Sequence, residues 1–397
     1  MKTQDFLFWL INIYLFFEYV RPQTIYPSLD FLPFTQLVIL TTLIFIFIKR
    51  DIVHVNNTIN ILMFIFFVVI LLSCFFAINS IVAFDRIGEI IAWYIIYFLI
   101  TRIINTEDRF LIFMLGFLLY SFKMAQFSFR GWGGMGFGYS SWGSGGGPGW
   151  FQNSGEFGVQ MCVFLPLSFY FIIALRQYWP KWKTFFFTLF PLFAISGTIS
   201  SSSRGALLGA IAVMVWILFK SRYKIKGLLI LCAVAVIALQ FVPPEQIARF
   251  ESAGKEDDRT SQTRLERWEK GIDMANRYPL FGVGYANWGV ADRVLYGGGG
   301  GLSHNIFIEC VSELGYSGLC VFILLIFATF FNNYQTRKKA LSKISNNQFV
   351  YYMAHGLDGA LIGYLVSGFF VTVLYYPYFW INLSFSVALN NIARNLK

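Results

Sequence analysis

The chain has 397 residues, of which 57% are hydrophobic, 20% aromatic and only 13% charged. A soluble globular domain carries roughly 25% charged residues, so this composition excludes an ordinary soluble protein. The net charge of +10 is spread over short connections between apolar segments, a pattern that indicates a membrane protein and not a nucleic-acid-binding one.

Apolar runs recur along the whole chain at lengths near the ~20 residues that cross a bilayer as a helix. We predict an all-α fold, a polytopic helical bundle that forms one transmembrane domain over residues 1–397. The runs give about twelve expected transmembrane helices. They lie near residues 5–20, 31–48, 59–77, 87–104, 109–127, 157–175, 183–200, 205–220, 227–242, 304–331, 356–374 and 377–394.

The distribution of Lys and Arg predicts the orientation, because short basic connections stay in the cytoplasm. With a cytoplasmic N-terminus, the basic clusters at 49–50, 176–183, 220–226 and 337–343 all lie inside. The outer connections then hold mostly single arginines. Membrane lipid is therefore an expected partner, and the first apolar run, which lacks a cleavage site, is expected to stay as a helix.

The first of two outer polar segments spans residues 130–156 and mixes glycine with tryptophan. Glycine gives backbone freedom, while tryptophan favours the membrane interface and can stack on sugar rings. The segment is either a flexible loop anchored by interfacial aromatics or a mobile cover over a glycan or lipid site. It contains no phosphate-binding P-loop motif.

The second outer segment, residues 243–304, is the longest polar stretch of the chain. Pro243-Pro244 is expected to end a helix, and a charged patch follows at 255–259. Residues 262–277 predict an amphipathic helix, because Leu265, Trp268, Ile272 and Ala275 recur at spacings of three or four. We therefore expect a large outer loop that contains short helices.

Arg204 opens an apolar helix directly after four serines, Ser200 to Ser203. Serine hydroxyls and the free N–H groups of a helix N-terminus suit an anion such as phosphate. The alternative is an arginine that only extends to the membrane interface. We favour anion binding, because an arginine that only extends to the membrane interface would not need four neighbouring serines.

Arg264 and Arg267 lie on the predicted amphipathic helix. Two arginines neutralise a pyrophosphate better than one, through paired hydrogen bonds. The alternative is a solvated helix face with local ion pairs. Because this helix is expected at the same membrane surface as Arg204, both interpretations remain open for Arg264.

His304 precedes the next apolar helix, in the run Ser303-His304-Asn305. Its ordinary pKa is near neutral, which suits a general base, although a histidine at a helix start can also simply cap or pack. With only three histidines, and five cysteines that show no CxxC spacing, we expect neither a metal site nor disulfides. The acidic residues at 256–258 are interpreted as a solvated patch.

Four sequence pieces together resemble the O-antigen ligase/polymerase superfamily of bacterial inner-membrane proteins. These pieces are Ser203-Arg204-Gly205-Ala206-Leu207-Leu208, Thr263-Arg264-Leu265 with Trp268, Tyr278 to Tyr285, and Ser303-His304-Asn305 with Glu313-Leu314-Gly315 and Gly318. Their order around one long loop is specific, and the resemblance covers about residues 200–320. The resemblance implies a multi-pass protein of the bacterial inner membrane, with its active site facing the periplasm.

A subgroup described as O-glycosylation ligases associated with exosortase systems is the most similar. Gly146-Gly147-Pro148-Gly149, Asn153 and Tyr375-Tyr376 carry this likeness. This chain has Gln152-Asn153-Ser154 where the subgroup usually has two adjacent asparagines, or an aspartate before them.

The resemblance implies a metal-independent, inverting glycan transferase that uses no cofactor. The donor would be a glycan on undecaprenyl pyrophosphate, and the acceptor a hydroxyl of a glycan, lipid or protein. Arg204 and Arg264 would hold the pyrophosphate, while His304 would activate the acceptor hydroxyl. Further residues expected to contact pyrophosphate or glycan are Arg267, Ser203, Lys123, Arg130, Asn153, Tyr285, Asn305 and Glu313; for Glu313, we favour hydrogen bonding within the bundle over this role.

Other functions remain in competition with a ligase. A polymerase of the same superfamily uses the same donor chemistry and differs in its acceptor. A transporter of lipid-linked glycan would carry ionisable groups near the membrane midplane and related halves, and we find neither pattern. A scaffold in an envelope glycan-assembly complex would not need the arginine and histidine placement, although such assembly proteins are possible partners.

Overall fold

The computed structural model describes residues 3–49, 55–138, 143–147, 151–240, 247, 259–342 and 346–396. Over these residues every regular element is a helix, so the predicted all-α class is confirmed for the described part of the chain. Predictions about Pro243-Pro244, the acidic residues at 256–258, and residues 139–142 and 148–150 of the 130–156 segment fall outside the described residues.

Each of the predicted apolar segments coincides with a long helix. These helices are α1 (Thr3–Tyr19), α3 (Phe34–Lys49), α4 (Thr58–Phe75), α5 (Ser80–Ile103), α6 (Glu107–Gly134), α7 (Ser154–Leu175), α8 (Lys181–Ser200), α9 (Arg204–Lys220), α10 (Lys224–Gln240), α14 (Ile306–Ala340), α15 (Gln348–Gly368) and α16 (Pro377–Arg394). Shorter elements are α2 (Pro22–Ile25), η1 (Pro27–Leu29), η2 (Arg176–Tyr178), α12 (Arg259–Arg277) and α13 (Trp288–Tyr296).

Among the described residues, 6 helical segments are long and apolar enough to cross a membrane by length and composition. They are Pro27–Ile48, Thr58–Phe75, Glu107–Gly134, Ser154–Tyr178, Lys181–Ser200 and Ile306–Ala340. Helices α1, α9 and α10 have 17 residues each, a rise of about 26 Å against a hydrocarbon core of roughly 30 Å. The larger number of spans therefore stays a prediction.

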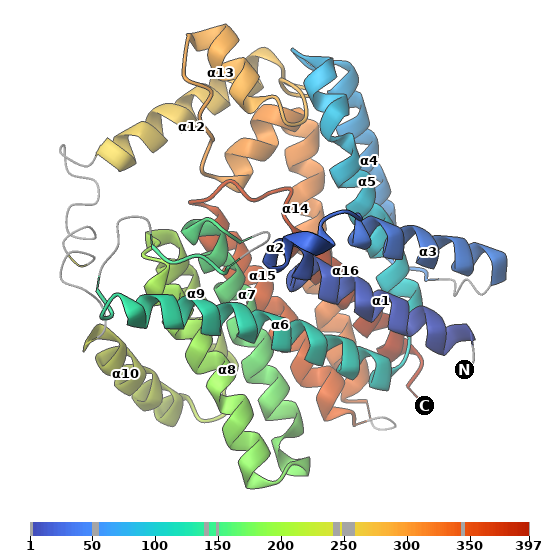
Figure 1. Ribbon diagram of the computed structural model, residues 1–397, viewed down its shortest axis with the longest axis vertical. Coiled ribbons are helices and arrows are strands. Elements are labelled where there is room, and N and C mark those ends of the chain that lie inside the picture. Colours follow the sequence, from blue (N-terminus) through green and yellow to red (C-terminus); the bar gives the residue numbers. More distant parts are fainter. Residues whose placement is uncertain are drawn as a thin grey trace.

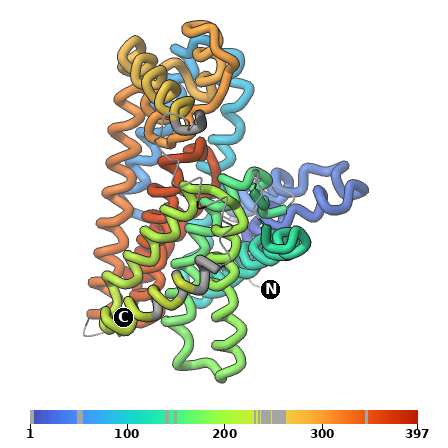
Figure 2. Tube along the Cα trace, turned by 90° about the vertical axis from the view of Figure 1, so that its left-hand side faces the viewer, coloured from blue at the N-terminus to red at the C-terminus, as the bar shows by residue number. Residues whose placement is uncertain are grey.

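The long helices do not all run in one direction. Figure 2 shows α14 along the long axis of the molecule, whereas Figure 1 shows α6 running across it. Both views place α12 and α13, which belong to the predicted polar loop, at one end of that long axis. The polar helices thus form a cap at one end of the apolar helices.

Small residues let α15 approach its neighbours α7 and α9 closely. A Cβ placed on Gly363 would lie 2.6 Å from the carbonyl oxygen of Cys162, and one on Gly359 would lie 2.7 Å from the Cβ of Pro166. On α9, a Cβ on Gly209 would lie 2.9 Å from the Cβ of Ser367. Such contacts are typical of tightly packed membrane helices. They hold the N-terminus of α9 near the C-terminus of α15.

A break inside α14 explains the sequence around Tyr278 to Tyr285. Gly315 has φ 70° and ψ −175° within the helix, a combination that is essentially restricted to glycine. The carbonyl groups released by this break accept hydrogen bonds from the returning loop: the Val283 N–H donates to Ser312 (2.8 Å) and the Gly284 N–H to Glu313 (3.1 Å). The motif therefore docks the loop onto α14.

The predicted amphipathic helix lies within α12. The prediction that its apolar residues share one buried face is partly wrong, because two of them are exposed. Leu265 and Ile272 are 56% and 48% exposed. The inward face is rotated, because Gly271 permits close approach: a Cβ there would lie 2.4 Å from Ile308 and 2.8 Å from Trp288. Residues on this inward face are Arg264, Arg267, Trp268, Gly271, Met274 and Ala275.

The glycine- and tryptophan-rich segment also starts later than predicted. Helix α6 continues to Gly134, so Arg130 belongs to the end of that helix and not to a loop. Its exposed side chain lies on the last turns of α6.

Candidate active site

Arg204 occupies the first position of α9, after a tight turn from α8. The Ser203 hydroxyl caps α9 by accepting from the Ala206 N–H at 3.3 Å. The hydroxyl of Ser201 donates to Thr198 at 2.7 Å, and that of Ser200 is 2.8 Å from the hydroxyl of Ser128. Two of the four serines are thus engaged in packing, and the anion-binding potential rests on Arg204, Ser203 and the helix N-terminus.

The glycine-rich segment 143–147 lies directly on this turn. The Ser144 N–H donates to the Ser200 carbonyl at 2.9 Å, and a Cβ on Gly143 would lie 2.0 Å from the Ser201 carbonyl oxygen. Gly143 also has φ 64°, which glycine adopts without strain. The segment therefore packs against Ser200 and Ser201, in the turn that precedes Arg204.

Two adjacent side chains of α12 form hydrogen bonds to the backbone that directly precedes His304. Arg267 donates from Nη1 to the Leu302 carbonyl at 3.2 Å, and the Trp268 indole N–H donates to the Ser303 carbonyl at 3.1 Å. His304 itself has φ 53°, a left-handed conformation that is uncommon for residues other than glycine. Two side-chain hydrogen bonds to the preceding carbonyls therefore help to impose this conformation.

Positive charge surrounds the half-buried His304 imidazole. Burial lowers the pKa of His304, and the Arg264 and Arg267 guanidinium groups lower it further, to about 4. The imidazole is therefore neutral at neutral pH and has a nitrogen lone pair available to take a proton. Arg264, Arg267 and His304, predicted separately from sequence, are thus brought together.

Arg204 is linked to this cluster through the connection between α15 and α16. A Cβ on Gly205 would lie 2.7 Å from the Cβ of Phe370, and two residues later Thr372 accepts a hydrogen bond from the His304 backbone N–H at 2.8 Å. The α9 N-terminus and the His304 turn therefore contact the same short segment.

Three predicted substrate-binding residues form internal hydrogen bonds. Asn305 caps α14 by accepting from the Phe307 and Ile308 N–H groups at 2.8 and 3.2 Å. The Glu313 carboxylate accepts from the Ala286 and Trp288 N–H groups at 3.1 and 3.0 Å. Tyr285, which is 1% exposed, donates to the Arg86 carbonyl at 3.4 Å. All three hold the loop and helix starts in place.

The remaining predicted residues lie on α6 and α7. Asn153 caps α7, accepting from the Gly155 N–H at 2.8 Å, and Lys123 is half-buried along α6. In the described part of the chain, no group of three or more His, Cys, Asp or Glu side chains is arranged to hold a metal ion.

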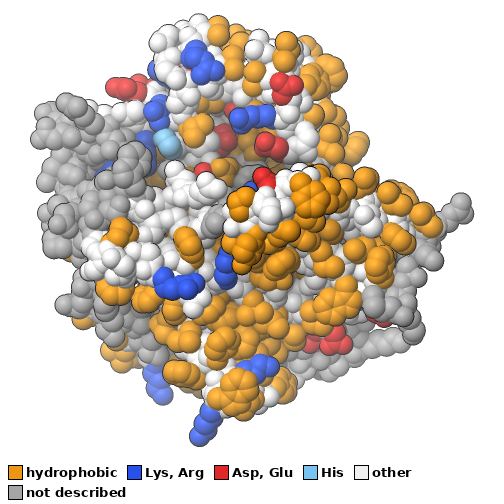
Figure 3. Space-filling model, viewed as in Figure 1, with side chains coloured by type: hydrophobic (Ala, Val, Ile, Leu, Met, Phe, Trp, Pro, Cys, Tyr) orange, Lys and Arg blue, Asp and Glu red, His pale blue; other side chains and the backbone are white. Residues whose placement is uncertain are grey.

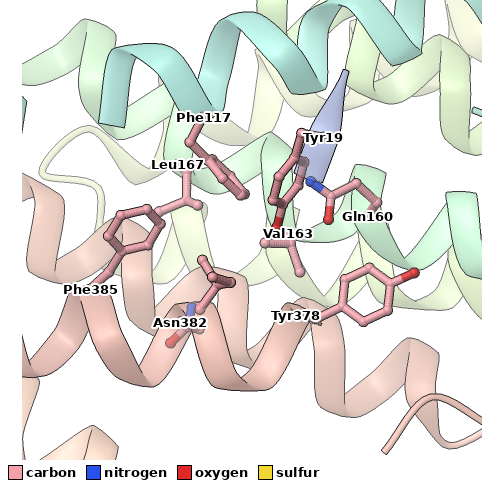
Figure 4. Close-up of a pocket in the computed structure, with 9 residues that line it drawn as sticks. Tyr19, Phe117, Gln160, Val163, Leu167, Tyr378, Asn382 and Phe385 are labelled. Carbon is pink, nitrogen blue, oxygen red and sulfur yellow. The ribbon is translucent and has the colours of Figure 1, made fainter. Parts of the chain in front are cut away.

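Charged side chains gather at the end of the molecule that carries α12 and α13, while apolar side chains dominate the face below it (Figure 3). A separate narrow crevice, too small to admit a water molecule, lies between α1, α6, α7 and α16. Tyr19, Gln160, Tyr378 and Asn382 surround it together with apolar side chains (Figure 4). None of the predicted site residues lines this crevice.

Sequence reasoning missed Phe369, Phe370 and Thr372. Their run is mostly apolar and was included in the predicted transmembrane segment 356–374, whereas α15 ends at Gly368. No spacing or composition signal separates these residues from a helix end, so only the folded chain shows their contacts.

The fold and this cluster define a polytopic membrane protein with a cationic, histidine-containing site at one end. Residues 189–323 match the family model described as O-antigen ligase. The match includes Arg204, Arg264, Arg267 and His304 and supports a glycan-transferring function of the ligase or polymerase type. A comparison with curated proteins gives no match.

Proposed function

We propose that this protein transfers a glycan from undecaprenyl pyrophosphate to an acceptor hydroxyl at the periplasmic face of the inner membrane. The observation that carries the proposal is the position of His304 beside Arg264 and Arg267, whose positive charges, together with burial, lower the imidazole pKa. A pair of cations can bind a pyrophosphate, and a neutral imidazole can accept the proton of the acceptor hydroxyl. Similarity to O-antigen ligases over the same residues supports this assignment.

In the proposed reaction the acceptor oxygen attacks the anomeric carbon, and the bond from that carbon to the pyrophosphate oxygen breaks. His304 takes the hydroxyl proton, while Arg204 and Arg264 stabilise the charge that develops on the departing pyrophosphate. Attack opposite the leaving group inverts the anomeric configuration. Each step uses side chains of this chain, with Arg267 supporting both the anion and the His304 turn.

Bound pyrophosphate would also change the proton affinity of His304. Its negative charge offsets the two arginines, so the imidazole pKa rises from about 4 toward its ordinary value when donor is present. The base is thus neutral in the free protein and becomes a better proton acceptor in the donor complex.

Alanine substitutions test the proposal. Replacing His304 removes the base and is expected to lower transfer by about 100- to 10,000-fold; replacing Arg204 or Arg264 is expected to cost about 100- to 1,000-fold. Transfer is measured in a deletion strain carrying each variant, with membrane abundance measured by immunoblot. Full activity in the His304 and Arg204 variants would contradict the proposal.

Arg277→Ala supplies a matched control on the same helix. Arg277 pairs with Asp273 at 2.9 Å, and its side chain is 53% exposed, so its loss should leave transfer unchanged.

The uncomplemented deletion strain distinguishes a ligase from a polymerase. Unattached full-length lipid-linked chains indicate a ligase, single lipid-linked repeat units indicate a polymerase, and an unchanged glycan profile counts against both. The likeness to O-glycosylation ligases also leads us to propose that the protein acts together with an exosortase system.

A further inference from the structure

We propose that the segment 369–376, between α15 and α16, is a positioning element of the transfer site, and that Thr372 fixes the backbone of His304. The inference rests on the proposed function. It extends the site beyond residues 189–323, the part of the chain that is similar to O-antigen ligases.

Thr372 acts on the most unusual backbone of the site. The His304 N–H donates to the Thr372 hydroxyl oxygen at 2.8 Å, while His304 holds its left-handed φ of 53°. A left-handed residue persists only where its surroundings determine it. Arg267 and Trp268 fix the carbonyls of the two preceding residues, and Thr372 fixes the N–H of His304 itself. The imidazole direction therefore depends on α12 and on the 369–376 segment.

Aromatic packing joins the same segment to both helices next to His304. The Phe369 ring lies 5.2 Å from the Trp268 ring of α12, edge to face, and 6.2 Å from the Phe307 ring of α14. Because Trp268 also bonds to the Ser303 carbonyl, a shift of Phe369 would move the turn that carries His304.

The other end of the segment is anchored independently of His304. The Leu374 N–H donates to the buried Glu309 carboxylate at 3.2 Å, and the Tyr376 hydroxyl is bonded to the Glu156 carboxylate at 2.7 Å. Glu309 belongs to α14 and Glu156 to α7, so the segment is tied across two helices and has little freedom to move.

Phe370 completes the link by packing against Gly205, next to Arg204. One rigid segment thus contacts the residue after the proposed phosphate-binding arginine and the backbone of the proposed base. Transfer needs the base and the leaving group in a defined relative position, and a displacement of about 1 Å can cost roughly 100-fold in rate. The segment sets that relative position.

The test compares Thr372→Val with Thr372→Ser in the full-length protein. Valine keeps the shape but loses the acceptor oxygen, whereas serine keeps the oxygen. We expect the valine variant to transfer glycan about 10- to 100-fold more slowly, and the serine variant to restore most of the rate. Binding of inorganic pyrophosphate to the detergent-solubilised protein should be unchanged in both variants, because the arginines remain. Thermal unfolding of each variant checks the fold.

Each other outcome has a defined meaning. A wild-type rate in Thr372→Val, with His304→Ala inactive, overturns the positioning role and leaves the proposed function standing. Equal loss in the valine and serine variants, or loss of pyrophosphate binding or folded protein along with the rate, shows a merely structural effect and also overturns it. Retained transfer in His304→Ala and Arg204→Ala means that the proposed function itself is wrong.

Discussion

His304 combines a left-handed backbone with an imidazole held neutral by burial and two arginines. Each feature is costly alone: the backbone is strained, and a base beside cations is weakened. A bound anion would relieve the second cost, because it compensates the guanidinium charges. The local chemistry of this residue therefore fits the donor-bound state of the proposed reaction.

The pKa of His304 can be tested directly in the free protein by NMR of labelled histidine, assigned with His304→Asn. We expect protonation only near pH 4, since the pKa is lowered from 6.5 to about 4. Arg264→Gln removes a positive charge, which favours the protonated form and raises this pKa. The rise should be partial, because burial is the larger cause.

The pH dependence of the transfer rate should reflect the same lowered pKa of His304. Since His304 of the free protein is neutral above about pH 4, kcat/KM for the lipid-linked donor should stay level as the pH falls through 6.5 and decline only near 4. A wild-type profile that declines near 6.5 would show that His304 is not held as described.

Helix α14 illustrates how one glycine organises an element. The break at Gly315 exposes the carbonyls of Ser312 and Glu313 to the returning loop, and that loop leads to α13 and then to His304. The space around Gly315 is closed, since a Cβ there would lie 2.5 Å from the Leu280 carbonyl oxygen. Position 315 therefore controls the docking of the whole polar cap.

Gly315→Ala is expected to destabilise the protein by about 2 kcal/mol or more, from backbone strain and this clash. Gly88→Ala in α5 is the matched control. Its Cβ would meet nothing within 4 Å, and alanine is favoured over glycine in a helix by about 0.5–1 kcal/mol. Thermal unfolding in detergent measures both variants. Equal stability of the two would contradict the role given to the break.

At the scale of the whole molecule, helices α14 and α15 are held in place at two levels along their length. Near one end they meet the cap and the 369–376 segment. Farther along, Arg337 of α14 forms an ion pair with Asp358 of α15, and these side chains are only 13% and 1% exposed. Asn333 also donates to Asp358, at 2.9 Å. This buried cluster fixes how the two helices pack.

Asp358→Ala would leave the Arg337 charge buried without its carboxylate, which we expect to cost about 3–5 kcal/mol. Asp273→Ala removes the partner of Arg277 and the acceptor of the Tyr296 hydroxyl and should cost much less, because the Asp273 side chain is 42% exposed. Unfolding of purified protein and membrane abundance report the difference. A stable Asp358→Ala variant would mean that other contacts hold α14 against α15.

The sequence by itself determined the helical class, the position of each long apolar helix and the identity of Arg204, Arg264 and His304 as candidates. Apolar run length and local motifs carry that information, because both are properties of neighbouring residues. Only the tertiary structure decided that Leu265 and Ile272 face outward, that Asn305 caps α14 while Glu313 binds the N–H groups of the returning loop, and that Thr372 bonds to His304. These features depend on close approach at Gly271 and Gly315 and on contacts between distant parts of the chain, which periodicity does not encode.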